Sequence, residues 1–312
     1  MPKHIDVVTP CFNERECVPL FYDEIARVFS SIDGYDFSVT YVDDGSSDGT
    51  LDEIKKLAET HGRSRVKYIS FSRNFGKEAA IYAGLCSAKG DLVVLMDSDL
   101  QHPPSLIPEM ITAIEEGYDS CAAYRGNRKG EAPVRSFFAA RFYGLLNSMS
   151  SVDMKPSATD FRMMTRKMLD AVISLGETER FTKGLFQWVG FTTKWVEFPN
   201  IVRAAGQTKF SFFSLFKYAV NGFVSFSTVP LRLASIIGAS VVFAAFIYML
   251  FELIKAVFFG IKTAGFATTV ILILFLGGII ITLLGIIGEY LARIYQEIKK
   301  RPIYITKETN VE

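Results

Sequence analysis

The sequence has few cysteines, and no two of them form a C-x-x-C pair. The four are Cys11, Cys17, Cys86 and Cys121, and their spacing indicates neither a zinc site nor a disulfide framework. We therefore expect reduced thiols that pack as small apolar side chains. The N-terminus also lacks the basic and then apolar segments of a cleavable signal peptide, since MPKHIDVVTP leads straight into a strand-like run.

The sequence also lacks an excess of charge of either sign. The formal net charge is +1, so the chain as a whole shows no electrostatic signature of nucleic-acid binding, and we expect no nucleic-acid partner. The patterns G-x-G-x-x-G and G-x-x-x-x-G-K-[ST] are both absent, which removes the main support for a dinucleotide site or a P-loop.

Long hydrophobic runs are present, and they lie near the C-terminus. Residues 233–251 and 264–288 contain no charged side chain, and each run is long enough to cross about 30 Å of hydrocarbon as a helix. The alternative, a pair of buried core helices, is disfavoured because soluble cores rarely hold two such runs in tandem. We predict a transmembrane hairpin over residues 231–291, which makes the protein multi-pass.

The charges around this hairpin predict its orientation. The connection carries Lys255 and Lys262, whereas the flanks carry more basic residues, namely Lys217, Arg232, Arg293, Lys299, Lys300 and Arg301. The positive-inside rule therefore places both termini in the cytoplasm. We expect a Phe-rich amphipathic segment over 210–230 to lie in the membrane interface, with a core-facing helix as the alternative. For residues 134–149, an interfacial helix and a core-facing helix are equally compatible with the sequence. Residues 292–312 are expected to form a cytoplasmic tail, loose after Arg301.

The N-terminal part alternates apolar runs with helical periodicity. The expected strands are 5–9, 37–42, 66–71, 92–96 and 120–124, and the expected helices are 18–32, 50–61, 77–88 and 104–116. This alternation predicts an α/β domain with an open, mostly parallel sheet covered by helices. We assign it to a cytoplasmic catalytic domain over residues 1–209.

Polar residues follow three of these expected strands, in the segments 10–14, 43–50 and 97–102. Ligands of open α/β sheets bind beyond the carboxyl ends of the strands, so this edge is the expected active site. Asp97 and Asp99 bring two carboxylates together there, and like charges so close favour a neutralising cation. Hard oxygen ligands predict Mg²⁺ or Mn²⁺. His102 is a further candidate ligand, with a structural role as the alternative.

The segments VVTPCFNERE, VDDGSSDGT and MDSDLQHPP resemble the catalytic motifs of glycosyltransferase family 2. The later segments ATDFRMMTRKM, RFTKGLFQWVGF, RAAGQTKF and FSTVPLRL resemble polyprenyl-phosphate glycosyltransferases, among them dolichyl-phosphate mannose synthases and, more closely, bactoprenol glucosyltransferases. The resemblance covers nearly the whole chain. It implies a GT-A (Rossmann-like) fold, a UDP- or GDP-sugar donor, a divalent metal, inversion at the anomeric carbon and a bacterial inner-membrane location. Undecaprenyl phosphate is the expected acceptor. Glucose from a UDP-sugar is the expected sugar, with N-acetylglucosamine, galactose and mannose as open alternatives.

The resemblance also implies roles for individual residues. On the donor side it assigns nucleotide contacts to Pro10, Phe12, Glu14, Asp44 and Asp97, and metal and diphosphate contacts to Asp97, Asp99 and Gln101. On the acceptor side it assigns phosphate contacts to Arg125, Arg135, Arg203 and Lys209. Catalytic roles fall on Asp99, Arg125 and Asp160. Phe12 stands where a Tyr is usual, and Thr159 stands where a Gly usually precedes the aspartate.

Two points of function stay open at this stage. Asp160 is either a base or an orienting group, because a lipid phosphate with a second pKa near ~6 is largely ionised at neutral pH. The overall function has two alternatives. The first is a processive polysaccharide synthase, which would need more than two spanning helices and a Q-x-x-R-W motif that this sequence lacks. The second is an inactive membrane scaffold, and the intact acidic cluster argues against it. The sequence leaves homo-oligomerisation open.

Overall fold

The structure is a computed structural model that describes residues 2–126, 155, 157–178, 180–199, 229–259 and 265–311. The predicted segment 134–149, most of 210–230, and Arg135, Arg203 and Lys209 lie outside the described residues.

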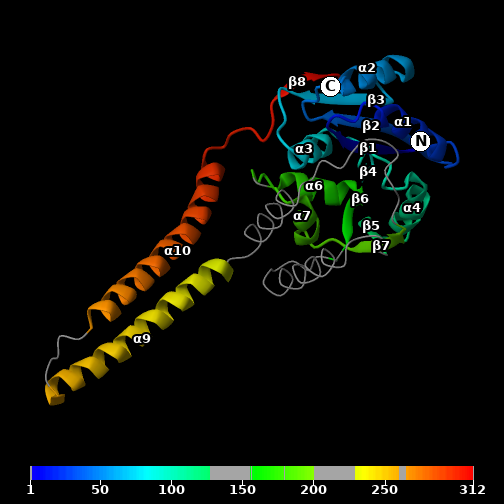
Figure 1. The fold of residues 1–312 in the computed structure, drawn as a ribbon. Helices are drawn as coiled ribbons and strands as arrows, with labels where there is room; N and C mark the ends of the chain where they lie inside the picture. The colour runs from blue at the N-terminus through cyan, green and yellow to red at the C-terminus, as the bar shows by residue number, and fades with distance from the viewer. Residues whose placement is uncertain are drawn as a thin grey trace. The chain divides into compact units, whose positions relative to one another are not determined.

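One mixed sheet organises the first compact part of the chain (Figure 1), with the strand order β7-β5-β6-β4-β1-β2-β3-β8. The strands are β1 (Lys3–Cys11), β2 (Tyr35–Asp43), β3 (Val66–Phe71), β4 (Leu92–Leu95), β5 (Ser120–Arg125), β6 (Ala158–Thr165), β7 (Thr193–Phe198) and β8 (Thr306–Thr309). Strands β1 to β4 pair in parallel, as do β5 and β7. β6 runs antiparallel between β4 and β5 and so joins the two parallel parts. Every strand expected from the sequence is confirmed, and the fold is GT-A.

Helices cover both faces of this sheet. They are α1 (Cys17–Phe29), α2 (Thr50–His61), α3 (Lys77–Ser87), the short η1 (Pro104–Leu106), α4 (Ile107–Glu115), α6 (Arg166–Ser174) and α7 (Thr182–Trp188). Along β1, Ile5 and Val7 belong to the core under α1 and α4, whereas Val8 belongs to the core under α3, α6 and α7. Successive side chains of a strand point to opposite faces, so an apolar strand such as β1 anchors both cores.

The C-terminal tail is part of this sheet, so the expectation of a loose end is wrong. β8 pairs antiparallel with β3, and the Tyr304 ring stacks on Phe71 with centroids 4.8 Å apart. The Asn310 side chain accepts a hydrogen bond of 2.6 Å from the Tyr68 backbone. The tail thus covers a strand edge that would otherwise expose unpaired backbone groups. The short polar sequence TKET gave no apolar signal from which to predict a strand.

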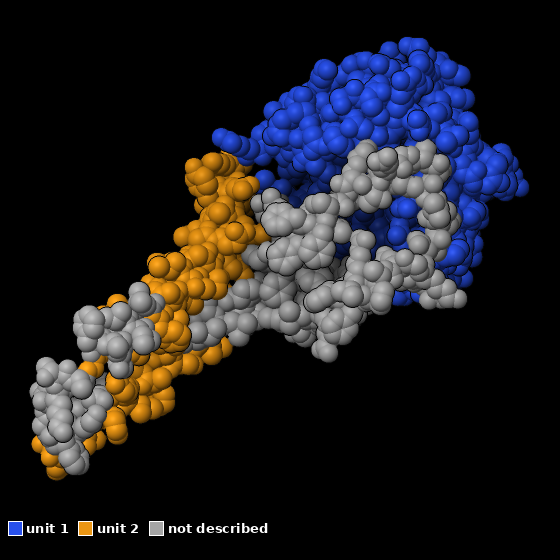
Figure 2. Space-filling model, viewed as in Figure 1, with its two compact units in different colours: residues 1–222, 301–312 blue, residues 223–300 orange. Residues whose placement is uncertain are grey.

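The chain divides into two compact units (Figure 2), residues 1–222 with 301–312 and residues 223–300. The second unit contains α9 (Val229–Phe259) and α10 (Phe266–Ile298), which extend beyond the uncharged runs that the sequence marked. Within the described residues, one helical segment is long and apolar enough to cross a membrane: Phe275–Ile298, with a mean hydropathy of 2.0 and no buried part.

Candidate active site

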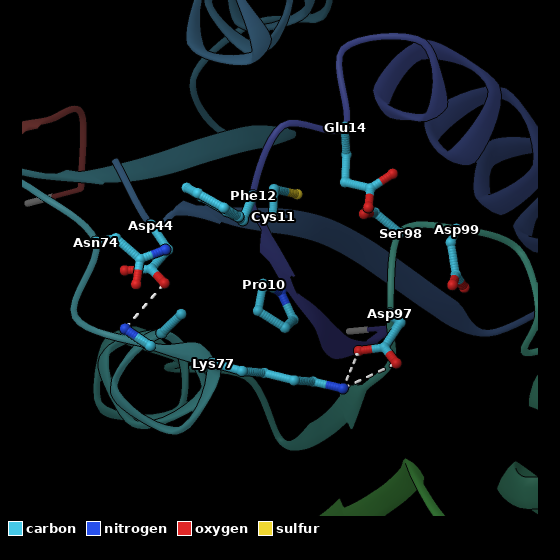
Figure 3. A pocket seen from close by; sticks show the side chains of 12 residues that line it. Pro10, Cys11, Phe12, Glu14, Asp44, Asn74, Lys77, Asp97, Ser98 and Asp99 are labelled. Atoms are coloured by element: carbon cyan, nitrogen blue, oxygen red, sulfur yellow. Dashed lines mark hydrogen bonds and ion pairs between the residues drawn. The ribbon is translucent and has the colours of Figure 1, made fainter. Parts of the chain in front are cut away.

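The predicted donor residues gather in one pocket at the carboxyl ends of β1, β2 and β4. The register brings Cys11 of β1 opposite Asp43 of β2, and β4 pairs with β1 from its other side, so the three polar segments meet. The pocket has a volume of about 290 Å³ and is lined by Pro10, Cys11, Phe12, Glu14, Asp44, Asn74, Gly76, Lys77, Ala80, Asp97, Ser98 and Asp99 (Figure 3). The residues that the resemblance assigned to the nucleotide therefore lie together in one pocket.

Asp44 shapes the wall of this pocket. Its carboxylate accepts hydrogen bonds from the backbone N–H groups of Phe75 (2.6 Å) and Gly76 (2.9 Å), and burial raises its pKa. The neighbouring Gly45 has φ +69°, and a Cβ there would lie 2.6 Å from the carbonyl carbon of Arg73. Only glycine allows this close approach. These backbone contacts give Asp44 a structural role in addition to the nucleotide contact expected for it.

Lys77 is a site residue that the sequence analysis missed. It is the first residue of α3, and its ammonium group lies 2.7 Å from Asp97 and 2.7 Å from Asp160. Figure 3 shows it reaching across the pocket toward Asp97. The available signal was a lysine at a helix start directly after a glycine, Gly76, which has φ +99°. Such a position projects a side chain from a strand-end loop, but its partners come from two distant segments.

Electrostatics in this cluster favour full ionisation. Burial opposes the charge on Lys77, yet Asp160 and Asp97 together raise the pKa of Lys77 far above its ordinary value. Burial likewise acts to raise the pKa of Asp160, but the ammonium groups of Lys183 and Lys77 outweigh it and hold that pKa well below the ordinary range. The pKa of Asp97 is also lowered, because attraction to Lys77 overcomes its burial. The two carboxylates are therefore ionised at neutral pH.

Asp160 itself projects from β6 and is nearly buried, with 12% of its side chain exposed. Lys183 of α7 is its second cation, 3.8 Å away. The preceding Thr159 is buried and donates a hydrogen bond of 2.9 Å to the Ala123 carbonyl. The strand therefore accommodates threonine in place of the usual glycine by tying its hydroxyl to β5.

The expected metal ligands stand on one short segment. The Asp99 carboxylate accepts a hydrogen bond of 3.1 Å from the Gln101 backbone, and the Gln101 amide oxygen accepts one of 3.3 Å from Arg125. Among the described residues, no group of three or more His, Cys, Asp and Glu gathers as a metal cage. Mg²⁺ commonly takes one or two carboxylates and completes its shell with water and substrate phosphate oxygens, so Asp97, Asp99 and Gln101 fit such an ion.

His102 fits the structural alternative better than the role of a ligand. It is buried, and its ring stacks on Phe161 with centroids 5.5 Å apart. Burial lowers its pKa, and Nδ1 accepts a hydrogen bond of 3.4 Å from the Asp97 backbone. A neutral ring so held steadies the backbone of the acidic segment.

Of the residues expected at the acceptor phosphate, Arg125 is the one that the structure describes. It ends β5 and donates a hydrogen bond to Gln101, so it stands directly beside the acidic segment.

The cysteines are free thiols, three of them buried, as expected.

A GT-A sheet with an acidic pocket at its strand ends defines a glycosyltransferase. The comparisons specify the family: residues 6–173 match the model of glycosyl transferase family 2, and residues 229–294 match the GtrB C-terminal hairpin. The chain belongs to glycosyltransferase family 2.

Relatives resemble the chain over nearly its whole length. A Bacillus subtilis protein named as a glycosyltransferase, CsbB, is 45% identical over 98% of this chain and 92% of its own. The prophage bactoprenol glucosyl transferase homolog of Escherichia coli is 39% identical over 97% of this chain and 98% of its own. Among solved structures, the mannosyltransferase PcManGT of Pyrobaculum calidifontis, in complex with GDP-Man and Mn²⁺, shares the fold. Its TM-score is 0.50 at 18% identity, covering 72% of this chain and 64% of that one.

Proposed function

We propose that this protein transfers a hexose, with glucose as the best-supported sugar, from a UDP-sugar to a polyprenyl phosphate such as undecaprenyl phosphate. Relatives named bactoprenol glucosyl transferase, from Escherichia coli and the Shigella phage SfV, are both 39% identical over 97% of this chain. The observation that carries the proposal is the contact of Asp160 with Lys77 at the wall of the strand-end pocket. It joins the residue expected to be catalytic to the pocket expected to hold the nucleotide.

The proposed reaction is a single displacement. An oxygen of the acceptor phosphate attacks the anomeric carbon and forms the new C–O bond. The bond from that carbon to the donor diphosphate breaks, and its electron pair leaves with the nucleoside diphosphate, which inverts the anomeric configuration. The transition state resembles an oxocarbenium ion. With the phosphate as a dianion, which its second pKa near ~6 allows, no proton needs to move.

The geometry favours an orienting role for Asp160 over a base. Its pKa lies well below the ordinary range because Lys183 and Lys77 overcome its burial, so it is a weak proton acceptor. Asp160 holds Lys77 in place and adds negative charge beside the developing oxocarbenium ion. A divalent cation, Mg²⁺ or Mn²⁺, held by Asp97, Asp99 and Gln101, would supply Lewis-acid stabilisation of the leaving diphosphate.

We also propose a bacterial cytoplasmic-membrane location, with α9 and α10 as a two-helix membrane hairpin. The match to the GtrB C-terminal hairpin supports this. Because residues 1–222 and 301–312 form one compact unit, the chain must return to the side on which it started. An even number of crossings meets this condition. Lysines and arginines near the hairpin ends favour the cytoplasm for this unit and for both termini.

The test is a transfer assay with the full chain in lipid nanodiscs. Undecaprenyl phosphate is offered with UDP-glucose, UDP-N-acetylglucosamine, UDP-galactose, GDP-glucose or GDP-mannose. We expect one lipid-linked hexose per acceptor, fastest with UDP-glucose. A lengthening glycan would instead show a processive synthase, and no transfer with any donor would show an inactive scaffold.

A further inference from the structure

A second, smaller pocket is lined in part by residues that neighbour Asp160 on β6. Its lining is Lys155, Ala158, Thr159, Arg162, Phe181, Lys183, Gln187 and Trp195, and none of these residues lines the strand-end pocket. Its volume is about 10 Å³, which is room for roughly one water molecule. Lys183 is an ion-pair partner of Asp160, and Thr159 ties β6 to β5; the other side chains of the pocket take no part in these contacts.

Arg162 is the unusual member of this pocket. It follows Asp160 by two positions on β6, so both side chains leave the same face of the strand. It is 2% exposed, and among the described residues its Nε and Nη1 have no hydrogen-bond partner. Its guanidinium packs 3.9 Å from the centre of the Phe186 ring. Burying such a group is costly, and Asp160 offsets only part of that cost by attraction from a distance, so an anion that accepts hydrogen bonds from Nε and Nη1 would compensate for the rest.

Arg162 keeps its charge under physiological conditions. Burial lowers the pKa of Arg162 to about 9, which is still above neutral pH. Aromatic contact with Phe186 satisfies the face of the guanidinium but leaves the Nε and Nη1 donors unused. Those donors are suited to phosphate or carboxylate oxygens.

Two lysines add to the positive charge. Lys183 lies 3.8 Å from Asp160 and donates a hydrogen bond of 3.3 Å to the Ala158 carbonyl. The Lys155 ammonium stands 3.7 Å from the Tyr124 ring centre. Asp160 cannot balance all of this charge, because its shortest ion pair, 2.7 Å, is with Lys77. Glu197 is a second anion, which attracts Lys155, so it offsets part of the positive charge but not the charges of Arg162 and Lys183.

We propose that this pocket is a subsite for the acceptor's phosphate group, with Arg162 at its base and Lys183 and Lys155 as movable cations. The inference rests on the proposed function. Asp160 contacts Lys77, which lines the donor pocket, and Lys183, which lines the second pocket. Each pocket therefore contributes one lysine to the expected catalytic carboxylate, which is the relationship that a donor site and an acceptor site sharing that carboxylate would have. Lys155 and Lys183 are partly exposed and their stems are flexible, so the pocket widens for a phosphate when these stems swing outward, with both ammonium groups still within reach of it.

The test uses full-length protein in nanodiscs and the variants Lys183→Met, Lys155→Met and Arg162→Gln. Lys167→Met is the matched control, because Lys167 is exposed on α6 and lines neither pocket. We expect each pocket variant to raise the KM for undecaprenyl phosphate about ten- to a hundred-fold, the effect of losing a charge-assisted hydrogen bond. The Kd for UDP, measured by calorimetry, should stay within about twofold. If Arg162→Gln fails to fold, the two lysine variants carry the test.

Two further arms separate the outcomes. Inorganic phosphate should inhibit wild-type transfer in competition with the lipid, and the variants should lose that inhibition. If farnesyl phosphate inhibits and inorganic phosphate does not, the protein recognises the isoprenoid part of the lipid, and the phosphate subsite is overturned. A weakened UDP complex would assign the pocket to the diphosphate and also overturn it. If the wild type transfers to no polyprenyl phosphate, the proposed function fails, while phosphate binding by calorimetry still decides the subsite. Unchanged KM values in active variants refute the subsite alone.

Discussion

The Lys77 ammonium group lies 2.7 Å from the Asp160 carboxylate, although the two residues are 83 positions apart in the sequence. The same ammonium lies 2.7 Å from Asp97. One cation thus links the acidic segment after β4 to the aspartate of β6, and the two carboxylates together still outweigh it. The attraction to Lys77 favours the ionised form of both carboxylates and ties the segment after β4 to β6.

Replacing Lys77 should impair turnover more than nucleotide binding. Lys77→Met removes a charge-assisted contact worth about 1.5–3 kcal/mol, so we expect kcat to fall roughly ten- to a hundred-fold. Steady-state kinetics and UDP calorimetry would measure both effects. Lys56→Met is a suitable control, since Lys56 makes an exposed pair with Glu53 within α2. Full activity of Lys77→Met would show that the bridge has no part in transfer.

The pH dependence of transfer should report the acceptor rather than Asp160. The lowered pKa of Asp160 keeps it ionised until the pH falls below its ordinary value of about 3.9. We therefore expect activity to fall below about pH 6, where the lipid phosphate gains a proton. A phosphonate acceptor, whose second pKa is higher, should move this acid limb upward. A limb that stays in place would belong to an enzyme group and would restore the base role.

Metal dependence should follow the two carboxylates after β4. Asp99→Ala is expected to abolish transfer, and EDTA should silence the wild type until Mg²⁺ or Mn²⁺ is restored. A radiochemical transfer assay would measure both. Asp170→Ala is a control, because Asp170 pairs with Arg166 on α6, outside the pocket. Full transfer in EDTA would refute the metal assignment.

The pocket at the strand ends was predictable because its signals are local. Asp97 and Asp99 directly follow an apolar strand, and parallel strands bring their carboxyl ends to one edge. Lys77 was missed because its importance depends on Asp160, which reaches the pocket from β6. The antiparallel insertion of β6 between β4 and β5 is a long-range pairing that periodicity does not reveal. Arg162 was missed for the same reason, since a lone arginine within a strand does not show that it is buried.

The tail shows the same limit for the fold. Thr306–Thr309 is short and polar, and it becomes a strand because the edge of β3 offers backbone partners and Phe71 offers a ring for Tyr304 to stack on. The two apolar runs, by contrast, predicted helices correctly, although α9 and α10 extend past them because charged residues such as Arg232 and Arg293 continue the helices.

Topology reporters should test the hairpin. A reporter joined by a linker after Glu312 should read cytoplasmic, and one inserted at Thr263 should read external, because the catalytic sheet contains both early strands and β8. Alkaline phosphatase and green fluorescent protein fusions would distinguish the two sides. A cytoplasmic signal at Thr263 would mean that the hairpin does not cross.

Substitutions of Arg125 and Asp44 should affect different substrates, the acceptor lipid and the nucleotide respectively. If Arg125 contacts the acceptor phosphate, Arg125→Ala should raise the KM for the polyprenyl phosphate or lower kcat about ten- to a hundred-fold, with UDP affinity nearly unchanged. Lysine should rescue only partly, because it lacks the two-pronged guanidinium. Asp44→Ala should instead weaken UDP binding, since it also releases the Phe75 and Gly76 amides that form the pocket wall.

The hydrogen bond from Arg125 to Gln101 makes this comparison decisive, because Gln101 is an expected diphosphate and metal contact. Calorimetry with UDP and kinetics with the lipid measure the two effects separately, and Arg27→Ala is the control, an exposed arginine that pairs with Glu24. Equal loss of UDP affinity in Arg125→Ala and Asp44→Ala would assign Arg125 to the diphosphate. The acceptor phosphate would then depend on the cations of the second pocket, because the leaving diphosphate would occupy Arg125 when the lipid binds.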